Sequence, residues 1–354
     1  MSFEDGWAAL NLAMPERIPR TEYSVTEHWS LMSKVTGIPV DSKSSDGLKE
    51  QVIKSFVGPA HWNFDLIWNT LIGGHELGKY RSSMGHAVYS EGGVDFDEKL
   101  HVSFEDPEAV LNFDPVESLP HHEHKTLIER FEKSYKWICE YFPDAVNMTG
   151  VYITCISGLI ELLGWENLLL AAGIDPEKFG HLTNRYAIWV QKYFDALAES
   201  DVPVVMVHDD ITWSEGAFIH PDWYRKYVFP NYKKMLAPLK DSGKIILFTS
   251  DANYTEFLHD IVACGVNGFV MEPLTDLRFA AEHFGQTCVL IGNADTRILL
   301  HGSKSEIRAE VERCMDIGKK CPGFFMAVGN HIPPNTPIEN AVYYNEVYEE
   351  MSRR

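Results

Sequence analysis

The sequence predicts an α/β protein folded as a closed (β/α)8 barrel, and three observations support this. From residue 200 onward, short β-branched runs alternate with longer segments of helical periodicity, as in parallel sheets whose strands are joined by helices. Five such runs follow residue 200 and three weaker ones precede it, which gives eight strands. Most of the runs end in polar residues. Because spacing alone does not show closure, an open doubly wound sheet is the alternative.

The predicted strands are apolar on both alternating faces, as expected for strands covered by helices on one side and by a core on the other. The three weaker runs are residues 20–24, 64–69 and 146–154, and the five stronger ones are residues 202–210, 244–251, 267–273, 287–295 and 324–331. The clearest helix follows the fourth of the stronger runs. It carries Ile307, Val311, Cys314 and Ile317 at helical spacing, and Ser303 or Ser305 is suited to cap it.

One segment, residues 73–120, fits neither period and is rich in charges and paired glycines. We interpret it as an inserted excursion over the barrel mouth, able to act as a lid, within one domain that spans residues 1–354. No glycine fingerprint for dinucleotides and no Walker loop follows any predicted strand.

The composition excludes several classes of protein. The chain has 354 residues, 45% of them hydrophobic, and 31 Lys and Arg stand against 51 Asp and Glu, a formal charge of −20. Such a field repels phosphate backbones and anionic lipid headgroups, so we expect neither nucleic acid nor membrane as a partner. The six cysteines form no Cys-x-x-Cys pair, and no secretion signal or membrane span is evident. We therefore expect reduced thiols and a cytoplasmic protein.

In a barrel of this kind, the loops after the strands form the active face. The polar and aromatic residues at the predicted strand ends are therefore the site candidates: Tyr23, Trp68, Asn69, His208, Asp209, Asp210, Ser250, Asp251, Asn253, Glu272, Asn293, Asp295, Asn330 and His331. Any one of them could instead be a helix cap or a loop hydrogen-bonding residue.

Three of these candidates suit a metal ion. Asp251, Glu272 and His331 come from separate strand ends and offer oxygen and nitrogen ligands for Zn²⁺ or another divalent metal, with His208 as a fourth. Without a metal, the same carboxylates could share a proton and work as an acid/base pair.

Two other histidine patterns are weaker. The cluster at residues 119–126, LPHHEHKT, lies in a hydrophilic stretch and is interpreted as a solvated run. The spacing Asp295, Glu310, His331 also invites a metal, but Glu310 falls between apolar helix positions and is expected to face solvent. Of the nine tryptophans, Trp68 and Trp213 fall near the predicted barrel mouth, where they would suit a planar apolar substrate.

Several longer phrases resemble the uroporphyrinogen decarboxylase family. They are ALNLAMPERIPR (residues 9–20), HDDITWSEGAFIHPDWYRKYVFPNYKKM (208–235), GNADTRILLHGSKSEI (292–307) and GFFMAVGNHIPPNTPIEN (323–340). The resemblance implies a TIM-like barrel that is often dimeric, so a homodimer is an expectation here. It also implies one of two chemistries, porphyrinogen decarboxylation or methyl transfer to or from a corrinoid.

The residues favour the second chemistry. Family decarboxylases carry an arginine-rich phrase near the N-terminus and a catalytic aspartate at the second strand exit. The opening segment of this chain has only Arg17 and Arg20, and the second exit reads Trp68 and Asn69. An amide cannot supply the carboxylate that steadies a pyrrole cation.

The family's methyltransferases bind zinc through a His-x-Cys at the fifth exit, a Glu at the sixth and a Cys at the eighth. The corresponding residues here are Thr249 to Asp251, Glu272, and Asn330 with His331, so only the glutamate is retained. A site without thiolates is harder and argues against a thiol acceptor, but it can still polarise an ether oxygen.

The resemblance thus implies a corrinoid-dependent methyltransferase that demethylates a methoxylated aromatic or another small methyl donor. The methyl would pass to the cobalt of a separate corrinoid protein, since the chain lacks the Asp-x-His-x-x-Gly phrase that binds cobalamin. We expect Asp209, Asn69 and Tyr23 to orient the substrate. The residues expected to bind it are Trp68, Trp213, Asn293 and Asn330. The alternatives are a decarboxylase of a smaller carboxylated substrate and a non-catalytic ligand-binding barrel.

Overall fold

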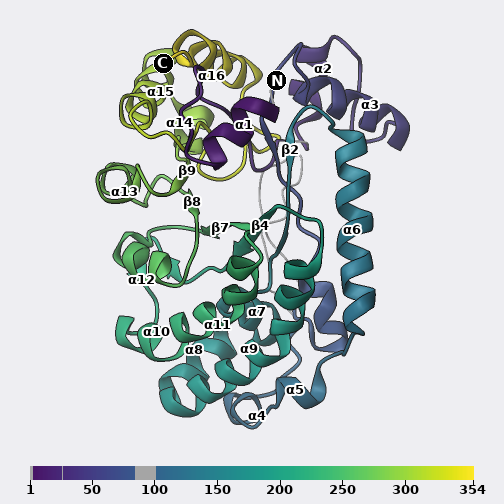
Figure 1. Ribbon diagram of the computed structural model, residues 1–354, viewed down its shortest axis with the longest axis vertical. Helices are drawn as coiled ribbons and strands as arrows, with labels where there is room; N and C mark the ends of the chain where they lie inside the picture. Colours follow the sequence, from purple (N-terminus) through teal and green to yellow (C-terminus); the bar gives the residue numbers. More distant parts are fainter. Residues whose placement is uncertain (1–2, 26, 84–100) are drawn as a thin grey trace.

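Strands and helices alternate along residues 3–25, 27–83 and 101–354, which the computed structural model describes (Figure 1). The parallel strands are β1 (Leu66–Ile67), β2 (Val146–Asn147), β3 (Thr149–Val151), β4 (Val204–His208), β7 (Ile245–Ser250), β8 (Gly268–Met271), β9 (Val289–Gly292) and β10 (Phe324–Phe325). After β4, a small antiparallel hairpin consists of β5 (Thr212–Trp213) and β6 (Gly216–Ala217).

The helices lie between and around these strands (Figure 1). They are α1 (Phe3–Leu10), α2 (Trp29–Thr36), α3 (Asp46–Val57), α4 (Pro107–Leu111), α5 (Pro115–Ser118), α6 (His124–Tyr141), α7 (Ile156–Leu163), α8 (Trp165–Ile174), α9 (Pro176–Glu199), α10 (Pro221–Tyr227), α11 (Phe229–Asp241), α12 (Leu258–Ala263), α13 (Leu277–Phe284), α14 (Thr296–His301), α15 (Lys304–Gly318) and α16 (Ile338–Met351), with the 3-10 helices η1 (Gly74–Tyr80) and η2 (Thr255–Phe257).

Six strands form one parallel sheet in the order β10, β9, β8, β7, β4, β3, and β1 pairs with β2. In this sheet, Met206 of β4 lies opposite Leu247 of β7, which in turn lies opposite Gly268 of β8. Because all these strands run in the same direction, their carboxyl ends meet at one rim.

Residues 19–21 join the two ends of this arrangement. On one side, the Thr21 amide donates to the carbonyl of Met326, just after β10, over 3.1 Å. On the other side, the Asp65 amide donates to the carbonyl of Arg20 over 2.9 Å, and the Val146 amide of β2 donates to the carbonyl of Asp65 over 3.0 Å. Counting residues 20–24 as the first strand and β2 with β3 as the third, the ring has eight members, and the predicted (β/α)8 barrel is confirmed.

Alternation along the strands separates two apolar regions. Val204 and Met206 of β4 belong to the cluster inside the barrel, while Val205 and Val207 belong to the larger cluster under the helices. Leu10 of α1 is part of the inner cluster, so this helix closes the end of the barrel where the strands begin. The accessible rim is therefore the opposite one, where the strands end.

The sequence placed the start of α15 at Ser303 or Ser305, and the structure selects Ser303. Its hydroxyl accepts from the Glu306 amide over 3.4 Å, and the Glu306 carboxylate accepts from the Ser303 amide over 2.7 Å. This reciprocal pair of bonds satisfies two backbone donors that the helix itself leaves open.

The predicted excursion begins with η1 and ends with α4 and α5. The Ser82 amide donates to the carbonyl of Glu161 in α7 over 2.7 Å, and Arg185 of α9 pairs with Asp114 at 2.6 Å. The two ends of the excursion therefore rest on the helices that follow β3. Residues 84–100 lie outside the described residues, so a lid over the barrel mouth stays a prediction.

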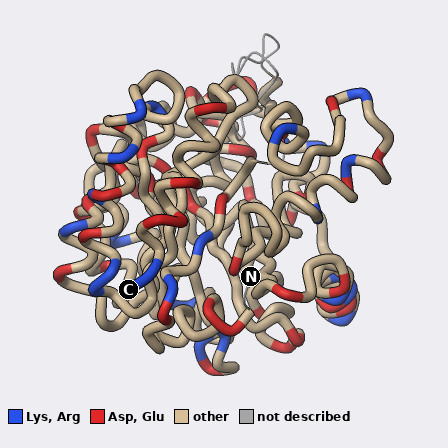
Figure 2. Tube along the Cα trace, turned by 90° about the horizontal axis from the view of Figure 1, so that it is seen from above, with Lys and Arg blue, Asp and Glu red and all other residues tan. Residues whose placement is uncertain are grey.

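Acidic and basic residues are interspersed over the outer elements (Figure 2). Within the described ranges, no single helix is long and apolar enough to cross a membrane, although α7 and α8, bent by 110°, satisfy that test as a pair.

Candidate functional site

A cavity of about 310 Å³ lies at the rim where the strands end. Its walls come from six strand exits and from the first residue of α8: Tyr23, Tyr152, Trp165, Asp210, Thr249, Ser250, Asp251, Val270, Glu272, Gly329, Asn330 and His331. Seven of the predicted site residues thus share one cavity, as the barrel geometry predicts: Tyr23, Asp210, Ser250, Asp251, Glu272, Asn330 and His331.

The most compact group of potential metal ligands combines His208, Asp210 and Asp251. One ligand atom from each lies within 4.8 Å of the others. The Nε2 atom of His208 is 3.3 Å from Oδ1 of Asp210, and the Asp251 amide donates to that same oxygen over 3.0 Å. One imidazole nitrogen and two carboxylate oxygens are a donor set that suits a divalent cation.

The orientation of His208 is fixed from two sides. Its ring stacks on that of Tyr152, with centroids 3.8 Å apart and planes 6° from parallel. Its Nδ1 atom is 3.2 Å from the hydroxyl oxygen of Ser157, which also accepts from the Asp210 amide over 2.7 Å. When Nδ1 carries the proton and donates it to Ser157, the Nε2 lone pair faces the carboxylates, which is the tautomer a metal ligand needs.

The carboxylates crowd one another. Asp251 is exposed at the cavity, yet desolvation by the surrounding protein raises its pKa well above its usual range, and the charges of Asp210 and Glu272 raise it further. Burial likewise raises the pKa of Glu272, against the lowering effect of its hydrogen bonds with Asn330 and the Ala252 amide. A cation or a proton shared among these groups would relieve the repulsion.

Glu272 already has partners for both carboxylate oxygens. The Asn330 side-chain amide donates to Oε1, and the Ala252 amide donates to Oε2 over 2.5 Å. His331 lies beside Tyr23, with ring centroids 5.4 Å apart. The predicted metal set is therefore only partly brought together: His208 and Asp251 belong to the compact group, Asp210 completes it, and Glu272 and His331 line the same cavity outside it.

Asp209 lies behind the cavity rather than in its wall. Its side chain is fully buried, accepts from the Ser157 amide over 2.6 Å and accepts from the Tyr232 hydroxyl. Burial raises the pKa of Asp209 to about 7. Asp209 is therefore a positioning residue, because it fixes the start of α7 next to His208.

Two other predicted substrate contacts, Asn69 and Asn293, also lie outside the cavity wall. The Asn69 amide is 3.4 Å from the hydroxyl of Ser134 in α6. The Asn293 amide donates to the carbonyl of Thr275 over 2.9 Å and its oxygen accepts from Arg313 over 3.0 Å, which ties it into the scaffold.

Trp213 and Trp68 do not line the cavity but contact residues that do. The Trp213 ring lies 5.6 Å from that of Trp165, a wall residue, and is 46% exposed. The Trp68 ring lies 5.2 Å from that of Tyr23. Both rings therefore back a wall residue rather than form the wall.

Sequence reasoning did not single out five wall residues: Tyr152, Trp165, Thr249, Val270 and Gly329. Tyr152 and Thr249 fall in predicted strands, so their position at a strand end was the available signal. Trp165 starts a helix, and no local pattern distinguishes it from packing residues.

The expectation that Glu310 faces solvent is wrong. Its side chain is buried, accepts from the Asp295 amide over 2.8 Å and pairs with Arg313 at 2.7 Å. Arg313 compensates the buried charge, which helical periodicity could not reveal. His122, interpreted as solvated, instead pairs with the buried Glu76 at 2.8 Å.

Many enzymes are (β/α)8 barrels whose active site lies at the end where the strands end, as does the cavity lined by carboxylates and an imidazole here. A family model for uroporphyrinogen decarboxylase (URO-D) matches residues 87–351. The match covers well over half of the chain, so this protein belongs to the URO-D family, a family of enzymes.

Curated relatives include the uroporphyrinogen decarboxylase of Geobacter sulfurreducens, 26% identical over 213 residues, which are 59% of this chain and 61% of that one. That of Carboxydothermus hydrogenoformans is 28% identical over 211 residues, 58% of each chain. The chain thus spans about three fifths of the length of these relatives. Among solved structures, a methyltransferase from Methanosarcina mazei superposes with a TM-score of 0.64 over 99% of both chains at 16% identity, which shows the shared fold.

Proposed function

We propose that the protein is a methyltransferase that takes a methyl group from a methoxylated aromatic and passes it to the corrinoid of a separate protein. The observation that carries the proposal is the charge of the cavity. Three carboxylates, Asp210, Asp251 and Glu272, line it, and no lysine or arginine of the described residues does. A tetrapyrrole decarboxylase must bind several substrate carboxylates, and the carboxylates of this wall would repel them.

The residues present also fit a divalent cation. His208, Asp210 and Asp251 would hold Zn²⁺ or a similar ion, and Thr249 adds a buried hydroxyl on the same wall with no hydrogen-bond partner among the described residues. When bound, such an ion supplies a Lewis acid for an ether oxygen. Glu272 and Asn330 hold each other and thereby keep the neighbouring wall rigid.

The chain's own groups can supply the proton that the reaction needs. Removing a methyl group from an aryl ether leaves a phenolate, which departs more easily when it is protonated. Where no cation is bound, Asp251 faces the cavity and keeps its proton more readily than an ordinary aspartate, because desolvation by the cavity wall and the nearby carboxylates raise its pKa. In this scheme the C–O bond breaks, the methyl group goes to the reduced cobalt of the corrinoid, and the Asp251 proton goes to the phenol oxygen.

The direct test mixes the purified protein with a reduced corrinoid protein and a panel of methoxyarenes, with methyl-cobalt absorbance as the readout. We expect methylation with at least one donor and a large loss in Asp251→Asn. Asp222→Asn, at an exposed position outside the cavity wall, is the matched control and should keep full activity. Absence of methyl-cobalt with every donor contradicts the proposal.

A second candidate is a decarboxylase, favoured by the names of the curated relatives. Release of CO₂ from a carboxylated substrate without any corrinoid would support it. The absence of basic side chains from the described cavity wall weighs against it.

A further inference from the structure

We infer that the methyl donor of this cavity is an uncharged one-ring aryl methyl ether, and that donors bearing an ionised carboxylate are rejected. The inference rests on the proposed function and specifies its substrate class.

Charge is the first argument. Asp210, Asp251 and Glu272 lie in one wall, and among the described residues the wall has no basic side chain. One guanidinium near the wall, that of Arg297, lines an adjoining cavity and is held by Asp295 through bonds of 2.7 to 3.1 Å. Its Nε and Nη2 donors are therefore engaged by Asp295, whose charge also offsets the attraction of Arg297 for a substrate carboxylate.

The aromatic part of the wall is the second argument. Tyr23, Tyr152 and Trp165 supply ring surfaces, and Val270 adds an apolar side chain at the end of β8. Flat apolar surfaces of this kind favour an aromatic ring by contact area and by edge or face packing. The cavity volume of about 310 Å³ is at the small end of ligand pockets, which run from about 300 to 1,000 Å³, and therefore favours a one-ring ligand.

Polar groups that can receive an ether or a phenol oxygen complete the fit. The hydroxyl of Thr249 is buried in the wall and has no hydrogen-bond partner among the described residues. A buried hydroxyl without a partner loses a hydrogen bond that water would provide, so a ligand oxygen there would restore it. An uncharged ether satisfies this group without adding charge to the carboxylates.

A matched pair of donors tests the inference. 2-Methoxyphenol and 4-hydroxy-3-methoxybenzoate share the methyl ether and differ in one carboxylate. Two like charges several ångströms apart near a protein surface repel enough to change an affinity by a factor of ten or more. We expect kcat/KM for methyl transfer to be at least tenfold higher for 2-methoxyphenol. Equal or better use of the benzoate would overturn the inference and leave the methyltransferase proposal intact.

Binding can be measured apart from turnover, through quenching of tryptophan fluorescence by each compound. If no methoxyarene of the panel is demethylated, the proposed function fails, while this binding measurement still decides on charge selection. Tighter binding of the uncharged compound supports the inference, and tighter binding of the benzoate overturns it. A trimethylammonium-substituted anisole that binds better than 2-methoxyphenol would also overturn it, because the site would then select cations.

Variants assign the effect to the wall. Glu272→Gln removes one charge and should narrow the affinity gap between the two compounds severalfold, whereas Glu272→Asp keeps the charge and should keep the gap. Glu282→Gln, on α13 outside the cavity wall, is the charge-matched control and should leave the gap unchanged. A gap that Glu272→Gln leaves unaltered contradicts the role of this carboxylate in selection.

Discussion

The imidazole of His208 lies flat against the phenol ring of Tyr152, with the ring centroids 3.8 Å apart and the ring planes 6° from parallel. Tyr152 in turn hydrogen-bonds through its hydroxyl to Tyr23. This relay runs from the first strand of the barrel, through the third, to the fourth. It holds the His208 ring so that Nε2 faces Asp210.

The stack predicts different effects for two substitutions of Tyr152. Tyr152→Leu removes the ring that holds His208 and should lower methyl transfer about tenfold, the size of effect seen when groups that orient a metal ligand are lost. Tyr152→Phe keeps the stack and loses only the hydroxyl, so it should retain most of the activity. Equal activities in the two variants, measured by methyl-cobalt formation, would show that the stack does not position His208.

Metal content distinguishes the compact ligand group from the one expected from sequence. Asp210→Asn and Asp251→Asn should lose the bound divalent metal, because each removes one of three clustered ligands. His331→Ala should keep it, since His331 lies beside Tyr23 and outside that group. Elemental analysis of purified protein after dialysis measures the content. Loss of metal in His331→Ala with retention in Asp210→Asn would restore the set predicted from sequence.

Most of the barrel could be predicted because strand and helix periods are local properties. The run at Val204–His208 is wholly buried and apolar up to its last residue, so the sequence revealed β4 clearly. Residues 20–24 gave a weak signal because they join the ring through isolated bridges and a few hydrogen bonds rather than through a long strand.

The site was predicted less completely, because a strand end does not tell which side chain turns into the cavity. Asp209 and Asp210 are neighbours, yet Asp210 lines the cavity and Asp209 points to Tyr232 behind it. The burial of Glu310 depends on its ion pair with Arg313 on the same helix. Helical periodicity does not predict the orientation of the Arg313 side chain. Such choices are made by tertiary packing.

The buried Arg20 pairs with Glu22, which connects the first strand to the eighth, and this pair should be important for stability. It pairs with Glu22 at 2.8 Å, and Glu22 accepts from the Val328 amide over 2.9 Å, two residues before Asn330. Both side chains are fully buried, so Arg20→Met leaves an uncompensated carboxylate and should destabilise the protein by about 3–5 kcal/mol. Urea unfolding measures this loss.

An exposed ion pair provides the control for that experiment. Arg308 and Glu350 are 2.5 Å apart but lie at the surface, so Arg308→Met should change stability by less than about 1 kcal/mol. A loss in Arg20→Met no larger than in Arg308→Met would show that the Arg20 pair adds nothing beyond an ordinary surface contact.

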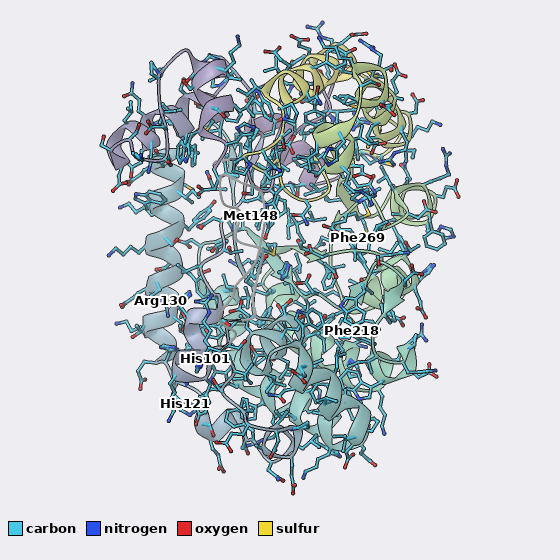
Figure 3. All side chains as sticks on the ribbon, turned by 180° about the vertical axis from the view of Figure 1, so that it is seen from behind. His101, His121, Arg130, Met148, Phe218 and Phe269 are labelled. Carbon is cyan, nitrogen blue, oxygen red and sulfur yellow. The ribbon has the colours of Figure 1, made fainter. Side chains whose placement is uncertain are left out.

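The buried Glu76 joins the excursion to α6 and α9 and gives stability a defined pH dependence. Arg130, which lies on the outer helix α6 (Figure 3), is 2.5 Å from Glu76, and the Tyr193 hydroxyl donates to Glu76 over 3.0 Å. Burial alone would raise the pKa of Glu76, but Arg130 and Tyr193 outweigh it and lower the pKa below 4.5. A carboxylate whose pKa is lower in the folded protein than in the unfolded chain stabilises the fold at pH values above its pKa in the unfolded chain. That contribution is lost as the pH falls through its pKa in the folded protein.

Arg130→Met should therefore destabilise the protein by about 2 kcal/mol at pH 7, the value of a hydrogen bond to a charged group. The difference from the wild type should shrink as the pH falls, because without Arg130 burial raises the pKa of Glu76, so that Glu76 takes up a proton at a higher pH in the variant than in the wild type. Urea unfolding between pH 7 and pH 4 measures it. Lys125→Met, which removes an exposed pair with Glu129, should show neither effect. A loss in Arg130→Met that stays constant over this range would mean that Arg130 acts by packing its aliphatic stem and not through the Glu76 carboxylate.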